Sequence, residues 1–151
     1  MYKDALRAAW AEINITNLDF NIKQIKEKVG SGVKITGVVK ADAYGHGSVR
    51  VATVLRANGI ESFAVATLSE AVRLRKSGFV LEEIMVLSPV PEPYIGTIIE
   101  HRLAPVVCDY KNAEAISKAA AEAGILIKGY IAVDTGMGRI GYSDDTTSVE
   151  D

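Results

Sequence analysis

Short segments rich in β-branched residues alternate with amphipathic segments along this chain of 151 residues. The strand-like segments cover residues 35–39, 62–68, 83–87, 103–109 and 127–133. The predicted N-caps of the helix-like segments are Asn17, Ser48 and Asn112. The predicted ends of these segments are marked by Gly30, Gly59, Gly78 and Gly124. Regular alternation of this kind predicts a parallel sheet whose strands are joined by right-handed crossovers.

Two α/β architectures have this pattern. A doubly wound sheet of five strands is complete at about this length. The first five or so βα units of a (β/α)₈ TIM barrel have the same order, within a fold of about 250 residues. Residues 10–15 alternate as a short strand before the first helix. The partial barrel is favoured, because Thr147 and Glu150 have the spacing of a capping box that begins a further helix.

Composition argues against several classes of function. The formal net charge is -2 and the isoelectric point is near 5.7, which gives no electrostatic basis for binding nucleic acid or an anionic membrane. No apolar run approaches the roughly 18 residues of a membrane span, and residues 1–10 lack the apolar core of a secretory signal. A single cysteine excludes an internal disulfide, and His46 and His101 lack the spacing of a metal site. We expect a soluble cytoplasmic protein without a metal.

The first candidate site is residues 38–47, Val-Val-Lys-Ala-Asp-Ala-Tyr-Gly-His-Gly. A buried strand that ends on a lysine and continues into a glycine-bearing loop is typical of an α/β active site. If burial lowers the pKa of Lys40, its neutral amine can form a Schiff base with a carbonyl compound; otherwise the ammonium group simply reaches solvent. Tyr44 can donate its hydroxyl to a phosphate or a substrate oxygen. His46 is interpreted as a loop residue rather than a catalyst, and Gly-His-Gly lacks the third glycine of a dinucleotide motif.

The second candidate site is residues 133–142, Val-Asp-Thr-Gly-Met-Gly-Arg-Ile-Gly-Tyr, directly after the fifth predicted strand. Its glycines let the backbone approach a ligand closely, and Arg139 supplies a permanently charged planar donor for a carboxylate or phenolate. Alternatively, this is a surface loop whose arginine forms a solvated ion pair. Because parallel strands all end at the same rim, we expect Lys40 and Arg139 on one rim, which favours a shared site.

At these residues the chain resembles the bacterial alanine racemases, which are pyridoxal-phosphate enzymes of fold type III. The two motifs above carry the resemblance, together with residues 10–13, Trp-Ala-Glu-Ile, which are similar to the family's opening strand. It spans about residues 8–142. The resemblance implies a truncated cofactor-binding barrel in residues 17–151, and it assigns residues 1–16 to a strand segment that belongs with an absent C-terminal domain.

The resemblance also implies a function. Pyridoxal 5'-phosphate would be held by Lys40, Tyr44 would contact its phosphate, and Arg139 would bind its phenolic oxygen and the substrate carboxylate. Lys40 would exchange the proton on the face of the substrate Cα used for D-alanine, during interconversion of L- and D-alanine for cell-wall precursors. The partners implied are a small amino-acid substrate and a second subunit in a homodimer, with no nucleic acid and no membrane.

Two departures from the family limit this transfer. Many members carry a carbamylated lysine immediately before the Val-Asp-Thr-Gly run, where it orients the arginine, and this sequence has Ala132 there. Lys128 lies about 13 Å away along an extended strand, which makes it a poor substitute. In members of the family, the opposing tyrosine base and most phosphate-binding residues lie in later parts of the sequence than the part that resembles this chain. The 151 residues alone are therefore expected to be inactive.

Three alternatives stay open at this point. A pyridoxal-phosphate carrier or homeostasis protein with the same barrel would bind the cofactor at the same lysine without turnover. A racemase of serine, lysine or arginine would share these motifs, because substrate size is set largely by other residues. A flavodoxin-like interaction module without a cofactor would need a self-sufficient doubly wound sheet.

Overall fold

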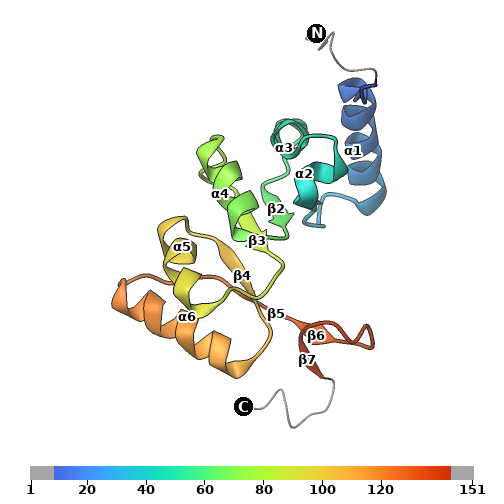
Figure 1. The fold of residues 1–151 in the computed structure, drawn as a ribbon. Helices are drawn as coiled ribbons and strands as arrows, with labels where there is room; N and C mark the ends of the chain where they lie inside the picture. The colour runs from blue at the N-terminus through green and yellow to red at the C-terminus, as the bar shows by residue number, and fades with distance from the viewer. Residues whose placement is uncertain (1–8, 144–151) are drawn as a thin grey trace.

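The computed structural model describes residues 9–143 (Figure 1). Its main sheet contains β1 (Thr36–Val38), β2 (Ser62–Val65), β3 (Glu83–Val86), β4 (Ala104–Val107) and β5 (Tyr130–Ile131). The helices are α1 (Ile15–Val29), α2 (Lys40–Tyr44), α3 (Ser48–Ala57), α4 (Leu68–Lys76), the 3-10 helix η1 (Glu92–Tyr94), α5 (Ile95–Glu100) and α6 (Tyr110–Glu122). A separate pair of short strands, β6 (Val133–Asp134) and β7 (Tyr142–Ser143), follows β5.

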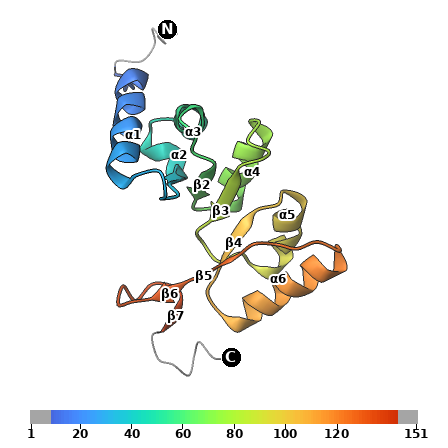
Figure 2. The same ribbon diagram turned by 180° about the vertical axis from the view of Figure 1, so that it is seen from behind.

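The strands of the main sheet lie in chain order, β1-β2-β3-β4-β5, and each is parallel to its neighbours. In register, Phe63 of β2 lies between Gly37 of β1 and Ile84 of β3. This order does not reverse within residues 9–143, whereas a doubly wound sheet reverses at its switch point. Figures 1 and 2 show the strands as a curved row with α1, α3, α4, α5 and α6 along its outer side. The prediction of a partial barrel is confirmed, and the flavodoxin-like alternative is wrong.

The core lies between the outer helices and the strands. Phe63 is fully buried and meets Phe79 edge to face, with the ring centroids 5.3 Å apart. The inward face of α3 includes Val51 and Leu55, as its helical spacing predicts. At Gly37 a Cβ would lie 2.6 Å from Leu55 Cδ1, so a larger residue there would make the end of the Leu55 side chain shift. Side-chain size at these positions therefore sets how closely α3 packs on the sheet.

The predicted strand at residues 10–15 is wrong. Residues 9–14 have no regular structure, and α1 already begins at Ile15. A strand needs a partner for its backbone N–H and C=O groups, and no strand in the described part of the chain pairs with this segment. The N-cap of α1 is Asn14, whose side chain accepts the backbone N–H of Asn17 at 3.0 Å. Asn17 is therefore not the cap that its residue type suggested.

Two further predicted caps are wrong, because another residue precedes the helix as its N-cap. The N-cap of α6 is Asp109, and Asn112 donates its backbone N–H to the Asp109 carboxylate at 2.8 Å. The N-cap of α3 is Gly47, and Ser48 is the first helical residue. The predicted helix ends are confirmed by left-handed glycines, where a side chain would be strained. These are Gly59, Gly78 and Gly124, with φ of 79°, 92° and 66°.

A polar cluster lies at the amino end of the sheet. Glu83, the first residue of β3, accepts hydrogen bonds from Lys128, Tyr130 and Ser62, and Lys34 Nζ lies 3.4 Å from its Oε1. Burial alone would raise the pKa of Glu83, but the bonds from Lys128 and Tyr130 and the charge of Lys34 hold that pKa at about 2. The hydrogen bond to Glu83 in turn raises the pKa of Lys128 to about 12. Lys128 is therefore held at the amino end of the strands.

No helix in residues 9–143 is long and apolar enough to cross a membrane. Within the same residues, no group of three or more His, Cys, Asp and Glu side chains could hold a metal ion. The capping box predicted at residues 147–150, with the helix it would begin, lies outside the described residues.

Replacing Glu83→Gln tests the amino-end cluster. Because the pKa of Glu83 is about 2 in the fold and ordinarily 4.5, ionised Glu83 stabilises the fold fully above about pH 4.5, and this stabilisation is lost as the pH falls towards 2. We expect the substitution to lower the free energy of unfolding at pH 7 by about 2 kcal/mol, after allowance for the exposed lysine partners. Urea unfolding measured from pH 7 to pH 2 checks this.

The matched control is Glu61→Gln, because Glu61 is exposed and lies immediately before the preceding strand, β2. It should leave both the free energy of unfolding and its acid dependence close to those of the wild type. An acid dependence that is unchanged in Glu83→Gln would contradict the assignment.

Candidate functional site

Lys40 lies at the carboxyl end of β1, where the strand turns into α2. The backbone N–H of Val39 bonds to the Ala64 carbonyl at 2.9 Å, so the ladder extends to the residue before Lys40. Val39 is fully buried, and Lys40 is half-buried. Lys40 Nζ forms no hydrogen bond or ion pair with residues 9–143. Lys40 thus follows the carboxyl end of β1, as the sequence predicts. The expectation of a buried strand is only partly met, because Gly37 and Val39 are buried while Val38 is 57% exposed.

The α2 segment is a single left-handed turn. Ala41, Asp42, Ala43 and Tyr44 all have φ between 50° and 52°. For a residue with a side chain this conformation costs about 1–2 kcal/mol relative to the right-handed helix. Four such residues in succession persist only where surrounding contacts hold them. The turn directly follows Lys40, so whatever holds it also limits where the lysine can lie.

Two carboxylates hold this turn. Glu70 of α4 accepts the backbone N–H of Ala41 at 2.6 Å. Asp42 accepts the backbone N–H and the hydroxyl of Ser48 at 2.9 and 3.0 Å, and it thereby satisfies the first backbone N–H of α3. Arg73 Nη1 lies 3.3 Å from the same Asp42 oxygen. The N–H of Ser48, then its hydroxyl and the charge of Arg73, lower the pKa of Asp42.

Tyr44 and His46 lie at the far end of the turn. Tyr44 is 73% exposed, and its hydroxyl forms no hydrogen bond with the described part of the chain. His46 Nδ1 lies 2.9 Å from the Ala43 carbonyl oxygen, and the backbone N–H of His46 donates to that oxygen at 3.1 Å. These contacts agree with the interpretation of His46 as a loop residue. The Tyr44 hydroxyl, which has no partner in the described part of the chain, stays available to a ligand.

Arg139 lies in the glycine-rich loop between β6 and β7. The Asp134 carboxylate accepts the backbone N–H groups of Gly136 and Gly138 at 2.9 and 3.0 Å. The N–H groups of Gly138 and Gly136 lower the pKa of Asp134 and fold the loop back on its own strand. Arg139 is exposed, and its guanidinium forms no hydrogen bond or ion pair within residues 9–143. Asp134 therefore shapes the loop while Arg139 stays unengaged.

The structure brings Lys40 and Tyr44 together on one turn and places Arg139 apart from them. Lys40 and Tyr44 are the first and last residues of α2, whereas Arg139 follows β5. The strand order puts β1 and β5 at opposite edges of the row. Both loops nevertheless extend from the carboxyl ends of parallel strands, as the sequence predicts. The three residues share a rim and lie at its two edges.

Ala132, where the resemblance led us to expect a carbamylated lysine, lies on the short link between β5 and β6. Its backbone N–H bonds to the Val107 carbonyl at 2.9 Å, which extends the pairing of β4 by one residue. Lys128 is bound to Glu83, at the opposite end of the strands. Lys128 is thus held away from the loop that carries Arg139, in agreement with its interpretation as a poor substitute.

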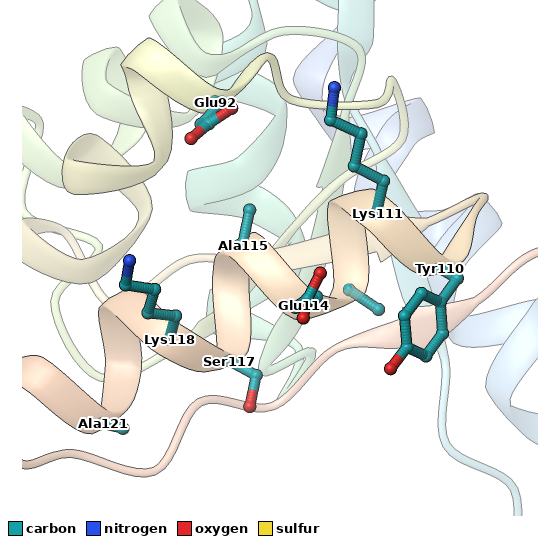
Figure 3. A pocket seen from close by; sticks show the side chains of 9 residues that line it. Glu92, Tyr110, Lys111, Glu114, Ala115, Ser117, Lys118 and Ala121 are labelled. Carbon is teal, nitrogen blue, oxygen red and sulfur yellow. The ribbon is translucent and has the colours of Figure 1, made fainter.

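A surface groove of about 800 Å³ lies between η1 and α6, and none of the candidate residues line it (Figure 3). Its charged side chains are of both signs, with Glu92 facing Lys111 and Lys118 across the groove and Glu114 on α6. Tyr110 lines one end of it. Exposed side chains of mixed charge are typical of a solvated surface, so the groove is not part of the candidate site.

Comparison with known proteins identifies the family. A family model described as "Alanine racemase, N-terminal domain" matches residues 13–149, which is most of the chain. The chain belongs to the alanine racemase family. The resemblance carried by the Lys40 and Arg139 motifs is confirmed at the level of the family.

Relatives of this racemase-family chain are much longer than the chain itself. The alanine racemase of Clostridium kluyveri is 48% identical over 145 residues, covering 96% of this chain and 37% of that protein. A solved alanine racemase from Clostridium difficile 630 matches with a TM-score of 0.88 and 37% identity, covering 93% of this chain and 37% of that one. A solved histidine racemase from Leuconostoc mesenteroides matches with a TM-score of 0.78 and 28% identity, covering 89% and 36%. The chain spans about 37% of the length of the alanine racemases that it matches.

Two residues of this family member that contact the lysine turn were not predicted as site residues. Glu70 and Arg73, both on α4, reach Ala41 and Asp42. A partial signal for Glu70 is present in the sequence, because Thr67-Leu68-Ser69-Glu70 has the form of a capping box, and both of its hydrogen bonds are formed. That motif indicates the start of a helix. It does not indicate the contact with the lysine turn.

Gly141→Ala tests the arginine loop of this alanine racemase family member. Gly141 has φ 112°, and a Cβ there would lie 2.8 Å from the Ala132 carbonyl oxygen. Gly136 has φ 121° with open space around its Cβ position, so Gly136→Ala is the matched control for backbone strain alone. We expect Gly141→Ala to lower the free energy of unfolding by about 3 kcal/mol and Gly136→Ala by about 1 kcal/mol. Equal losses in urea unfolding would contradict the close approach.

Proposed function

We propose that this chain forms the first part of a pyridoxal-phosphate-dependent racemase that interconverts L- and D-alanine, with Lys40 as the residue that binds the cofactor. One observation carries the proposal: a half-buried lysine follows the carboxyl end of β1, and its amine has no partner within residues 9–143. Family membership supports the reaction, because the relative that is 48% identical is an alanine racemase.

The side chains on the rim fit pyridoxal 5'-phosphate by their chemistry. Covalent binding of an aldehyde requires a primary amine, which Lys40 provides. The Tyr44 hydroxyl suits the phosphate and the Arg139 guanidinium suits the phenolic oxygen, and neither is engaged within the residues described. When bound, the cofactor supplies an electron sink for the negative charge that develops at the substrate Cα.

The residues of this chain would then orient the substrate and move one proton. Lys40 Nζ takes and returns the proton on the Cα face used for D-alanine, which requires its neutral form at the moment of proton removal. Arg139 binds the substrate carboxylate with a planar pair of donors. Asp134 supports this role indirectly, because its bonds to Gly136 and Gly138 shape the loop that carries Arg139.

Racemisation requires a second base on the opposite face, and we assign it to the C-terminal domain of a partner subunit in a homodimer. In this proposal residues 1–16 belong with that domain. The protein would act in the cytoplasm on a small amino acid, with no nucleic-acid or membrane partner. The 151 residues alone should bind the cofactor weakly and give no measurable racemisation.

A racemase of another amino acid is the second candidate, because a histidine racemase has the same fold at 28% identity. Turnover of L-alanine, L-histidine and L-serine by the full-length protein separates the two. Faster turnover of alanine than of the others supports the first proposal. Binding of the cofactor with no turnover of any amino acid would favour a carrier.

Reduction with borohydride in the presence of pyridoxal phosphate tests the lysine assignment. We expect mass spectrometry of the full-length protein to find the pyridoxyl group on Lys40, and Lys40→Arg to abolish both the label and racemisation, because a guanidinium does not condense with the aldehyde. Lys34→Arg is the control: Lys34 is exposed, precedes the same strand, and donates from Nζ to Glu83 Oε1 at 3.4 Å at the amino end of the sheet. A label on another lysine, or on none, would refute the assignment.

A further inference from the structure

Glu70 links the loops that follow two neighbouring strands. One carboxylate oxygen, Oε1, accepts the backbone N–H of Ala41, after β1, at 2.6 Å. The other, Oε2, accepts the N–H groups of Ala66 and Thr67, after β2, at 2.8 and 3.1 Å. A single side chain at the start of α4 therefore holds three backbone donors on the rim.

The capping of α4 accounts for only part of this bonding. A capping box requires that Glu70 accept the N–H of its own N-cap, Thr67. The bond to Ala41 is additional and spans 29 residues of sequence. The N–H that it binds belongs to the peptide between Lys40 and Ala41. The carboxylate thus fixes the peptide plane next to the Lys40 Cα, and with it the direction in which the lysine side chain leaves the backbone.

The same helix makes a second contact with the turn. Arg73, three residues after Glu70 on α4, lies 3.3 Å from Asp42. The turn between these contacts consists of four residues at positive φ, a conformation that local preference does not maintain. Lys40 itself has no side-chain partner within residues 9–143. Its placement in the structure therefore depends on its backbone, which α4 holds.

We propose that Glu70 is a positioning residue for Lys40, acting through its hydrogen bond to the Ala41 N–H to direct the lysine amine towards the cofactor and the substrate Cα. This rests on the proposed function, because it assumes that Lys40 binds pyridoxal phosphate. Glu70 touches neither substrate nor cofactor in this role. Its effect is on the geometry of proton transfer, where a small displacement of the amine has a large effect on the rate.

The test compares Glu70→Gln with Thr67→Ala in the full-length enzyme. Glutamine keeps the size of Glu70 but has one acceptor oxygen, so it cannot serve the loops after β1 and β2 together. Thr67→Ala removes the other half of the capping box, in which the Glu70 N–H donates to Thr67 Oγ1 at 3.4 Å, and it leaves the carboxylate in place. A loss that arises only from helix capping appears in both variants, as a lower melting temperature.

Three measurements report on Lys40: hydrogen exchange at the Ala41 amide, the rate and pH dependence of Lys40 labelling by pyridoxal phosphate with borohydride, and kcat and KM for alanine. Glu70→Gln should speed hydrogen exchange at the Ala41 amide. It should also shift the pH profile of Lys40 labelling and lower the labelling rate about tenfold. We expect kcat for alanine to fall about tenfold as well, while KM changes less than about twofold. Thr67→Ala should leave all three within about twofold of the wild type.

Wild-type exchange and labelling in Glu70→Gln would overturn the positioning role, and so would equal losses in Thr67→Ala. Failure of the proposed function has a different signature. It appears in the wild-type enzyme itself, as absence of the label on Lys40 and absence of racemisation, whatever the variants do.

Discussion

Parallel pairing is the constraint on which the rest of this structure depends. A strand parallel to its predecessor begins only after the chain has returned to the amino end, so each of β2 to β5 follows a crossover that buries one helical face against the sheet. Each crossover advances to the next position without reversal, so the helices form one outer layer. All strands then end at one rim. The geometry of pairing therefore directs the turn after Lys40 and the loop that carries Arg139 to the same end of the strands, at opposite edges of the row.

The two ends of the sheet differ in how their charged groups are satisfied. At the amino end, Glu83 is bonded to Lys128, Tyr130 and Ser62, which compensates the cost of withdrawing its carboxylate from water. At the carboxyl end, Lys40 and Arg139 have no such partner within residues 9–143. Paired charges are typical of stabilising clusters, whereas charges left free on a strand-end rim are typical of sites that bind a ligand.

Sequence patterns predicted the elements of this fold better than their ends. Apolar spacing located the strands and helices because burial of one face leaves a period in the sequence. The caps of α1 and α6 were misplaced by three residues, because Asn14 and Asn17, like Asp109 and Asn112, are equally good caps by residue type. Which of them caps the helix depends on how the chain enters it. Residues 10–15 alternate as a strand does, yet pairing requires a neighbour that the pattern cannot supply.

The turn after Lys40 is the part of the candidate site that local sequence predicts least. Ala-Asp-Ala-Tyr contains no glycine, and alanine strongly favours the right-handed helix, so residue preference argues against the positive φ that these residues adopt. The acceptor that holds Ala41 lies 29 residues away, on a helix whose own capping motif gives no sign of this second contact. Tertiary hydrogen bonds therefore outweigh local preference at the residue that follows the lysine. Strain of this kind is retained where a particular backbone geometry is needed, which makes the position of Lys40 a product of its neighbours in space rather than in sequence.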